Sequence, residues 1–379
     1  MADQSISIGE WTNQFSLPKL KKNCWESPRA PRKPIASAQP FHALPDDAEL
    51  TRDWTMLPES THAVVVGGGT MGADVAVVLA RGGCRVTVVE PHADRHPALR
   101  RHVADELAAA GVAQPPVPLH CVARLDDAEW PAVGLVVECI TERLADKQAL
   151  FAQLSRLAPP QALLTSNSSG LPISQISAGL PGRARCYGLH FFMPAHLVPL
   201  VEVVLGEASD PAGARALHDF MRACGSVPVL VRKDLPGFLA NRLQHALARE
   251  AFALIDQGVA TAEDVDAAVR FGFGFRFLAA GPVLQRDHAG LDVHCAAAAA
   301  IYPSLCNSAT PATVLQAHVA AGRLGMKSGA GFAEWPPAQK QVERARYAQL
   351  LRAGLDLLQS ELPAPRSAAD DNQKHEEST

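Results

Sequence analysis

The chain has 379 residues, a formal net charge of −4 and 47% hydrophobic residues. This length predicts about two domains with tails, and a mean hydropathy of +0.01 is typical of a globular chain rather than a membrane-dominated one. Because the chain carries no broad basic charge, we expect a small-molecule partner, with no nucleic acid and no membrane. The eight cysteines are scattered singly, without a Cys/His cluster at zinc spacing, which predicts reduced thiols and no metal site.

The two ends of the chain differ in composition from its middle. Residues 1–60 hold three of the five tryptophans and many prolines without an apolar period, which predicts an irregular N-terminal extension. Since this segment lacks the basic start and apolar stretch of a secretory signal, we expect a cytoplasmic protein. Residues 336–379 are predicted to form a C-terminal helix and then, from about residue 363, a polar disordered tail.

Short β-branched runs alternate with helical patterns between these ends. The runs occupy residues 62–66, 85–89, 133–138, 162–166, 185–190, 200–205 and 227–232, and helical patterns occupy 71–81 and 144–157. This alternation predicts an α/β domain over residues 61–232, in which helices cover a parallel sheet. From residue 234 to 322 the pattern is helical throughout and opens with a long helix at Pro236, which predicts a smaller all-α domain over residues 233–335.

A glycine-rich loop directly follows the first predicted strand. In A-V-V-V-G-G-G-T-M-G, the residues Gly67, Gly69 and Gly72 form a G-x-G-x-x-G frame between a strand and a helix. Gly67 permits a tight turn, Gly69 lets a pyrophosphate approach the backbone, and Gly72 lets the helix pack on the sheet. Thr70 and Met71 open that helix, whose free N–H groups can bind phosphates. The loop therefore predicts a Rossmann-like dinucleotide-binding domain.

An acidic residue ends the second predicted strand. Glu90 follows V-T-V-V, where its carboxylate can accept hydrogen bonds from an adenosine ribose and would repel a 2′-phosphate. Pro91 and His92 come next instead of an arginine, so the pattern favours NAD over NADP as cofactor. The alternative is a glycine turn that only tightens the corner, with Glu90 in solvent.

Several further motifs follow the glycine loop in order. They are V-V-E-C-I-T-E-R-L-A-D-K, T-S-N-S-S-G, G-L-H-F-F-M-P, L-V-E-V-V, K-D-L-P-G-F-L-A-N-R and G-R-L-G-M-K-S-G-A-G-F. With these motifs the chain resembles the 3-hydroxyacyl-CoA dehydrogenase family over residues 62–335. The resemblance implies NAD as cofactor and a helical second domain that forms a homodimer. It also implies oxidation of an L-3-hydroxyacyl-CoA to the 3-ketoacyl-CoA, as in fatty-acid β-oxidation.

A histidine and a glutamate are the leading catalytic candidates. His190 ends a predicted strand, where a neutral imidazole can take the proton of an alcohol while a hydride leaves. Glu202 lies in the apolar strand L-V-E-V-V, where a carboxylate is costly unless it is paired. Pairing with His190 would fix the imidazole tautomer. The alternatives are a histidine with a packing role only and a glutamate that pairs with an arginine elsewhere.

Two neutral polar residues are candidates for orienting a substrate. Ser169 follows a predicted strand in S-N-S-S-G, and Asn241 lies near the start of the first helix of the second domain. Both side chains can bond a substrate oxygen without competing as bases, although Ser166 or Ser168 could cap the same turn. The resemblance implies a catalytic and substrate-orienting set of Ser169, His190, Glu202 and Asn241.

Three more residues enter through the resemblance. It implies that Glu142 and Lys147 contact the cofactor and that Asn167 lies near the nicotinamide. The alternative for Glu142 and Lys147 is a simple ion pair at the start of a helix.

Two departures from the family pattern bear on the substrate. Met193 occupies the position of the family's asparagine in H-F-F-N-P, and Glu106 and Ala113 occupy positions at which the family contacts CoA through a serine and a lysine. Positive charge for a phosphate could come instead from Arg95, Arg100 and Arg101. A free 3-hydroxy acid such as carnitine or gulonate is therefore an alternative substrate. A catalytically silent NAD-binding protein is an alternative of another class.

An aromatic stretch in the helical region has two interpretations. F-G-F-G-F-R-F places four phenylalanines at alternate positions over residues 271–277. They are predicted to pack at a dimer interface or to line a substrate wall.

Overall fold

The computed structural model describes residue 54 and residues 56–112 and 119–365. Most of the predicted N-terminal extension and of the predicted tail lies outside the described residues, as does Ala113. Within the described part of the extension, Trp54 is buried, and its indole N–H donates to the Asp210 carboxylate at 3.0 Å. This tryptophan therefore packs on the domain that follows it.

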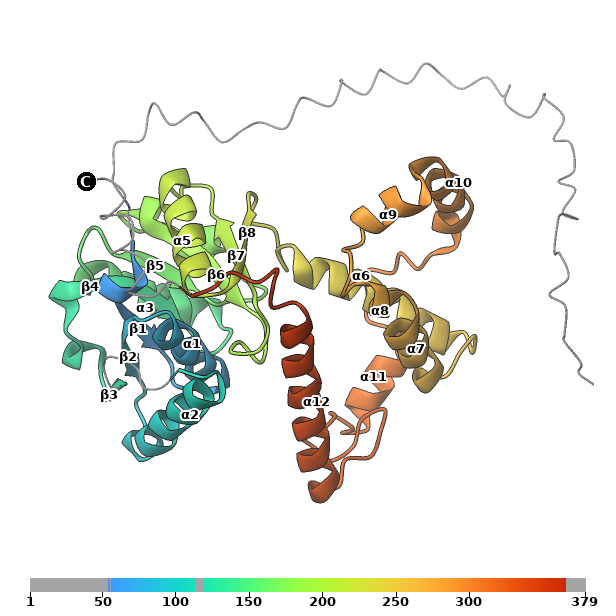
Figure 1. The fold of residues 1–379 in the computed structure, drawn as a ribbon, viewed down its shortest axis with the longest axis horizontal. Coiled ribbons are helices and arrows are strands. Elements are labelled where there is room, and N and C mark those ends of the chain that lie inside the picture. The colour runs from blue at the N-terminus through green and yellow to red at the C-terminus, as the bar shows by residue number, and fades with distance from the viewer. Residues whose placement is uncertain (1–53, 55, 113–118, 366–379) are drawn as a thin grey trace, which may run out of the picture. The chain divides into compact units, whose positions relative to one another are not determined.

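One sheet of eight strands forms the first part of the chain, in the order β3-β2-β1-β4-β5-β6-β7-β8 (Figure 1). The strands are β1 (His62–Val66), β2 (Arg85–Val89), β3 (His120–Val122), β4 (Val133–Glu138), β5 (Leu163–Ser166), β6 (Cys186–Phe191), β7 (Leu200–Leu205) and β8 (Val227–Val231). The first six strands are parallel to one another, whereas β7 is antiparallel to β6 and parallel to β8.

Four of the predicted strands, β1, β2, β4 and β7, coincide with the observed ones. The predicted parallel sheet is present in the first six strands, whereas β7 departs from it by running antiparallel to β6. Only residues 192–199 join β6 to β7, and a parallel crossover requires about a dozen residues or more, so the chain returns antiparallel. The prediction also missed β3, because three residues are too few to produce a recognisable pattern.

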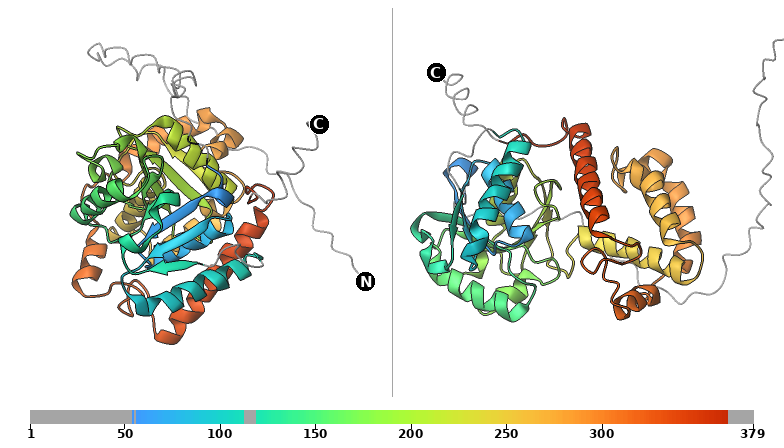
Figure 2. Two further views of the ribbon diagram at one scale, coloured as in Figure 1. Left: turned by 90° about the vertical axis from the view of Figure 1, so that its left-hand side faces the viewer. Right: turned by 90° about the horizontal axis from the view of Figure 1, so that it is seen from below.

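Helices cover both faces of the sheet, as the views in Figure 2 show. On one face lie α1 (Thr70–Arg81), α2 (His96–Ala109) and α5 (Pro211–Ala223), and on the other lie α3 (Leu144–Leu157) and α4 (Ile173–Ile176). Successive strand residues alternate between the two cores, since Val65 belongs to the first core and Val64 to the second. Burial on both faces explains why the strands are continuous β-branched runs.

The strand order reverses beside β1, because β2 and β4 flank it and lead away in opposite directions. The glycine loop joins β1 to α1 at this position. Open α/β sheets bind ligands at the carboxyl ends of the strands where the order reverses. The topology therefore places the glycine loop where a dinucleotide is expected to bind.

Helices make up the second part of the chain. They are α6 (Ala240–Asp256), α7 (Ala262–Ala268), α8 (Gly274–Arg276), α9 (Leu284–Ala289), α10 (Leu291–Ile301), α11 (Thr313–Ala320) and α12 (Pro337–Leu357). After β8 the described residues contain no strand apart from isolated bridges at Ala330. The prediction of successive helices over residues 234–322 is therefore confirmed.

The predicted start of the first of these helices is wrong. Phe238 has a φ of 49°, in the left-handed region, and α6 begins at Ala240. Pro236 therefore precedes the helix instead of opening it, and Asn241 lies in the first helical turn. The left-handed Phe238 turns the chain so that the next two backbone N–H groups point toward the sheet, where they find the partner described below.

The aromatic stretch is largely uncovered within this chain. Phe271, Phe275 and Phe277 are 74%, 65% and 44% exposed. Packing at a dimer interface and a substrate wall both remain predictions. None of the described helices combines the length and apolar character needed to cross a membrane.

Candidate active site

The strand register places His190 and Glu202 opposite each other. They are direct partners in the antiparallel pair of β6 and β7, and the imidazole Nδ1 lies 2.7 Å from the Glu202 Oε2 atom. His190 is 4% exposed and Glu202 is fully buried. The predicted pairing of these two side chains is thus present, and it arises from the antiparallel return of β7.

The second oxygen of Glu202 binds the start of α6. Oε1 accepts the backbone N–H of Leu239 at 3.0 Å and that of Ala240 at 2.7 Å. Because the carboxylate accepts these bonds while ionised, it requires a proton on the His190 Nδ1 atom. The Nε2 atom of a neutral imidazole is then an acceptor with a free lone pair.

Two aromatic rings hold the imidazole in place. The rings of Phe192 and Phe238 pack edge-on against His190, with centroid distances of 4.5 and 5.5 Å. The left-handed turn at Phe238 therefore makes two contacts possible. The Phe238 ring packs on the imidazole, and the next two backbone N–H groups bind Glu202.

In the loop after β5, the neighbouring residues Ser168 and Ser169 have different contacts. Ser168 is buried, donates to the Glu142 Oε1 atom at 2.5 Å and accepts the Leu171 N–H at 3.0 Å. Ser169 is exposed, and its hydroxyl has no hydrogen bond to any described residue, although its backbone N–H donates to Glu142 at 3.1 Å. Ser168 thus caps the loop, and the Ser169 hydroxyl is available to a ligand.

Asn167 is tied to the strand that carries the histidine. Its side-chain Oδ1 atom accepts the Phe191 N–H at 2.8 Å, and its own N–H donates to the Glu138 carbonyl at 2.9 Å. These bonds fix the amide next to β6, one residue from His190.

A buried ion pair missed by sequence reasoning lies below this loop. The Lys147 ammonium lies 2.6 Å from Glu138 Oε1 and 3.3 Å from Glu142 Oε2, and Lys147 and Glu138 are 1% and 0% exposed. Glu138 Oε2 also accepts the Ser166 hydroxyl at 2.6 Å. The sequence contained a sign of this ion pair. Glu138 ends an apolar strand, and a buried carboxylate needs a partner for its charge.

The glycine loop is shaped to accept a ligand. A Cβ added to Gly72 would lie 1.8 Å from the Gly67 carbonyl oxygen, and Gly67 has a φ of 106°, so both positions require glycine. A Cβ added to Gly69 would meet nothing within 4 Å. Gly69 is also the N-cap of α1, and because it has no side chain, the first N–H groups of the helix are left without a side-chain cap. These features fit a dinucleotide pyrophosphate.

Glu90 lies against the same loop. Its Oε2 atom accepts the Gly68 N–H at 3.1 Å and an Arg95 N–H at 3.2 Å, and the residue is 4% exposed. The alternative of a solvated Glu90 is therefore wrong, because the carboxylate is held by the loop backbone. The sequence did not indicate Arg95 as the partner of Glu90, because the short turn of residues 93–95 that brings them together has no recognisable pattern.

Substitutions at two glycines are expected to separate fold from cofactor binding. Gly69→Ala should raise the dissociation constant for NAD at least about tenfold with an unchanged melting temperature, since its methyl group points into open space. Gly72→Ala should lower the melting temperature, since its methyl group collides with the Gly67 carbonyl. Calorimetric titration with NAD and thermal unfolding measure the two effects. Equal NAD affinity in Gly69→Ala and wild type would contradict the assignment of the loop.

The charge of Glu142 predicts a pH dependence of stability. Burial raises the pKa of Glu142, but the hydrogen bonds from Ser168 and Gly170 and the nearby Lys147 ammonium lower this pKa by more. A carboxylate with a lowered folded-state pKa stabilises the fold above its unfolded pKa of about 4.3, and this contribution is lost as the pH falls.

Glu142→Gln should therefore be less stable than wild type at pH 7, by about 1 kcal/mol after allowance for solvent screening. The difference should shrink between pH 5 and about pH 3 as the wild-type carboxyl takes up a proton. Urea unfolding of both proteins across this range checks the prediction, and a difference that does not change with pH would contradict it.

Asn241 lines a hollow among the helices of the second part. The hollow has a volume of about 750 Å³ and is bordered by α6 and the segment that leads into α11. Arg242, His245 and Arg249 line it together with Asn241, while Asp256 contributes the one acidic group among its lining residues. Its polar character is mainly cationic.

Comparisons with known proteins identify the family. The model of the NAD-binding domain of 3-hydroxyacyl-CoA dehydrogenase matches residues 62–235, and the model of the C-terminal domain of that family matches residues 237–335. A model of pyridine nucleotide-disulphide oxidoreductases also matches residues 6–117, which include the glycine loop.

Individual proteins agree with the family models. The 5-formyl-3-hydroxy-2-methylpyridine 4-carboxylate 5-dehydrogenase of Mesorhizobium japonicum is 34% identical over 300 residues, which cover 77% of this chain and 97% of that protein.

Two crystal structures are also similar. That of a dehydrogenase of the same name, described as an NAD+ dependent dismutase, matches with a TM-score of 0.74 and 30% identity, over 78% of this chain and 98% of the other. That of an Escherichia coli 3-hydroxybutyryl-CoA dehydrogenase matches with a TM-score of 0.59 and 34% identity, over 73% of this chain and 60% of the other. The chain therefore belongs to the 3-hydroxyacyl-CoA dehydrogenase family and is an NAD-dependent oxidoreductase that acts on a CH–OH group.

Proposed function

We propose that this protein oxidises the hydroxyl group of a small hydroxy acid with a free carboxylate, with NAD as the hydride acceptor and His190 as the general base. The observation that carries the proposal is the buried contact of 2.7 Å between His190 Nδ1 and a carboxylate that also binds the start of α6. This arrangement leaves the Nε2 atom ready to accept a proton.

The proton transfer follows from this arrangement. The Nε2 atom of His190 accepts the substrate hydroxyl proton, and the resulting positive charge is stabilised by the Glu202 carboxylate. Bound NAD supplies the hydride acceptor. Because the Glu202 carboxylate accepts two backbone N–H groups through Oε1 and faces the imidazole through Oε2, it orients the imidazole, which takes the proton.

The remaining site residues bind and orient. In the proposal Ser169 and Asn241 bond the substrate oxygen, and Asn167 lies beside the nicotinamide. Gly67, Gly69, Thr70, Met71, Gly72 and Glu90 hold the dinucleotide, and Glu142 and Lys147 shape its site through the loop after β5. Residues 61–232 accordingly form the cofactor domain and residues 233–335 the substrate domain.

The two serines offer a matched test of this assignment. Ser169→Ala should lower kcat/KM about tenfold without changing the melting temperature, because its hydroxyl bonds no described residue. Ser168→Ala should lower the melting temperature, because it removes two hydrogen bonds from the loop. Steady-state kinetics and thermal unfolding of both variants check this prediction, and full activity in Ser169→Ala would contradict the role of Ser169.

Two observations support a free carboxylate in the substrate. The hollow beside Asn241 is lined by Arg242, His245 and Arg249, which suit an anionic group. Glu106, whose carboxylate pairs with Arg352 at 2.8 Å, occupies a position at which the family resemblance implies a serine or lysine contact to CoA, so it offers no such contact.

An acyl-CoA thioester is the second candidate substrate. It is supported by the family model and by the side chain of Arg95, which is 50% exposed beside the glycine loop and can meet a phosphate.

A matched pair of substrates distinguishes the two candidates. Reduction of NAD is followed at the NADH absorbance band with 3-hydroxybutyrate and with its CoA thioester, and then with L-carnitine and L-gulonate. Turnover of free acids but not of the thioester is the expected result. Turnover of the thioester alone would overturn the substrate class, and NAD binding without any turnover would favour the catalytically silent alternative.

We further propose that the protein is a homodimer formed through residues 233–335. Leu239 directly precedes α6, and Leu243 and Leu247 follow it at intervals of four residues. The three are 47%, 58% and 41% exposed, so they form an apolar stripe that a second copy can cover. Sedimentation velocity of the full chain at several concentrations tests this, and a monomer at all of them would contradict it.

A further inference from the structure

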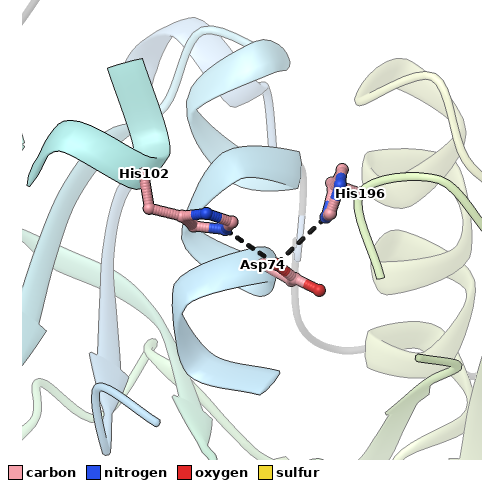
Figure 3. A group of neighbouring side chains, drawn as sticks. All are labelled: Asp74, His102 and His196. Atoms are coloured by element: carbon pink, nitrogen blue, oxygen red, sulfur yellow. Dashed lines mark hydrogen bonds and ion pairs between the residues drawn. The ribbon is translucent and has the colours of Figure 1, made fainter. Parts of the chain in front are cut away.

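Three side chains from separate elements meet beside the glycine loop (Figure 3). Asp74 lies on α1, His102 on α2, and His196 in the connection between β6 and β7. The Asp74 Oδ1 atom lies 2.8 Å from His102 Nε2 and 3.0 Å from His196 Nδ1. One carboxylate oxygen therefore faces two imidazole nitrogens.

The surroundings hold these groups in this orientation. The other oxygen of Asp74 accepts the Ala195 N–H at 3.1 Å, and His196 Nε2 lies 3.4 Å from the Glu106 Oε2 atom. A carboxylate behind the far nitrogen of a histidine is the usual outer support of a metal-binding imidazole. The cluster thus has three candidate ligand side chains and neighbouring contacts that orient them.

One nitrogen of the cluster has no hydrogen bond. His196 Nδ1 is buried and lies 3.0 Å from Asp74 Oδ1, but it makes no hydrogen bond in the described structure. A buried nitrogen without a hydrogen bond is costly unless another ligand occupies its lone pair. Its lone pair is therefore open to a metal ion that the Asp74 carboxylate would also bind.

The charge of the cluster suits a cation. Asp74 is 3% exposed. Its Oδ1 atom faces the two imidazoles at 2.8 and 3.0 Å, and its Oδ2 atom accepts the Ala195 N–H at 3.1 Å. A buried negative charge between two imidazoles would be neutralised by a bound divalent ion.

The geometry suits a transition metal more than calcium or magnesium. Zn²⁺ binds imidazole nitrogen and carboxylate oxygen at about 2.0–2.2 Å, which places tetrahedral ligand atoms about 3.3 Å apart. The two observed separations of 2.8 and 3.0 Å reach this value with shifts of a few tenths of an ångström. Calcium and magnesium prefer oxygen ligands.

We propose that Asp74, His102 and His196 form a binding site for a divalent transition-metal ion such as Zn²⁺. The ion would join α1 and α2 to the segment that follows the strand of His190. Asp74 and His102 also line a hollow of about 330 Å³ together with Gly68, Gly69 and Arg95, so water can reach the metal as a fourth ligand.

The proposed site departs from the sequence prediction of no metal. That prediction rested on the absence of a Cys/His cluster at short spacing, and the three ligands here come from distant parts of the chain. Only packing of α2 on α1, and of the β6–β7 connection on both, brings them together.

A titration with Zn²⁺ alone tests the proposal. The tag-free full chain, stripped of metal with a chelator, is titrated against a chromophoric zinc indicator at pH 7.5. We expect one equivalent to bind tightly, and His102→Gln and His196→Gln each to weaken this binding at least tenfold. His218→Gln, which removes a histidine of α5 outside the cluster, should bind as the wild type does.

Thermal unfolding guards against variants that fail to fold. All four metal-free proteins should melt cooperatively, and one equivalent of Zn²⁺ should raise the melting temperature of the wild type and His218→Gln only. A Co²⁺ complex of the wild type should show the visible absorption of tetrahedral nitrogen and oxygen ligation. The proposal is overturned if no stoichiometric binding occurs, or if the two cluster variants bind Zn²⁺ as tightly as the wild type.

Discussion

His190→Gln is expected to lower kcat by about 10²–10⁴-fold while the dissociation constant for NAD stays unchanged. Glutamine retains a polar side chain but cannot accept a proton near neutral pH, so the alcohol loses its base. NAD binding should survive, because the glycine loop and Glu90 lie at the carboxyl ends of β1 and β2, and His190 contacts neither of them.

Steady-state NADH production and calorimetric titration with NAD measure the two quantities. Glu202→Gln serves as the comparison, because it keeps acceptor oxygen for the start of α6 but removes the charge that stabilises the protonated imidazole. We expect its kcat to lie between those of the wild type and His190→Gln. Wild-type turnover in His190→Gln would rule out the imidazole as the base.

Lys147→Met is expected to lower the free energy of unfolding by about 3–5 kcal/mol. Methionine fills a similar volume, but it leaves the Glu138 carboxylate, which is fully buried, without its cation. Glu138 then keeps only the Ser166 hydroxyl and the Ile140 N–H as partners. The cost is that of a buried unpaired charge, so it greatly exceeds the value of an exposed ion pair.

A double variant and a surface control make this prediction specific. Glu138→Gln together with Lys147→Met removes both charges, and its stability should exceed that of Lys147→Met alone. Arg124→Met breaks an ion pair whose side chains are 75% and 69% exposed, and it should change the stability by no more than about 0.5 kcal/mol. Urea unfolding of all variants provides the comparison. A loss in Lys147→Met as small as that in Arg124→Met would show that Glu138 finds another partner.

The amino-acid sequence by itself indicated seven of the eight strands, the glycine loop and the candidates His190 and Glu202. These features depend on local patterns, such as β-branched runs, glycines at required positions and a carboxylate in an apolar strand, and local patterns survive without knowledge of the fold. The resemblance named Ser169 and left Ser168 as a possible cap, and the structure added that the Ser168 hydroxyl is the one that the Glu142 carboxylate binds.

The tertiary structure decided the contacts between distant residues. The antiparallel return of β7 sets Glu202 opposite His190, the turn at Phe238 joins that carboxylate to α6, and the packing of α1 and α2 gathers Asp74, His102 and His196. Spacing along the chain carries no information about such groups, because their proximity depends on strand direction and helix packing, which the whole sequence sets together.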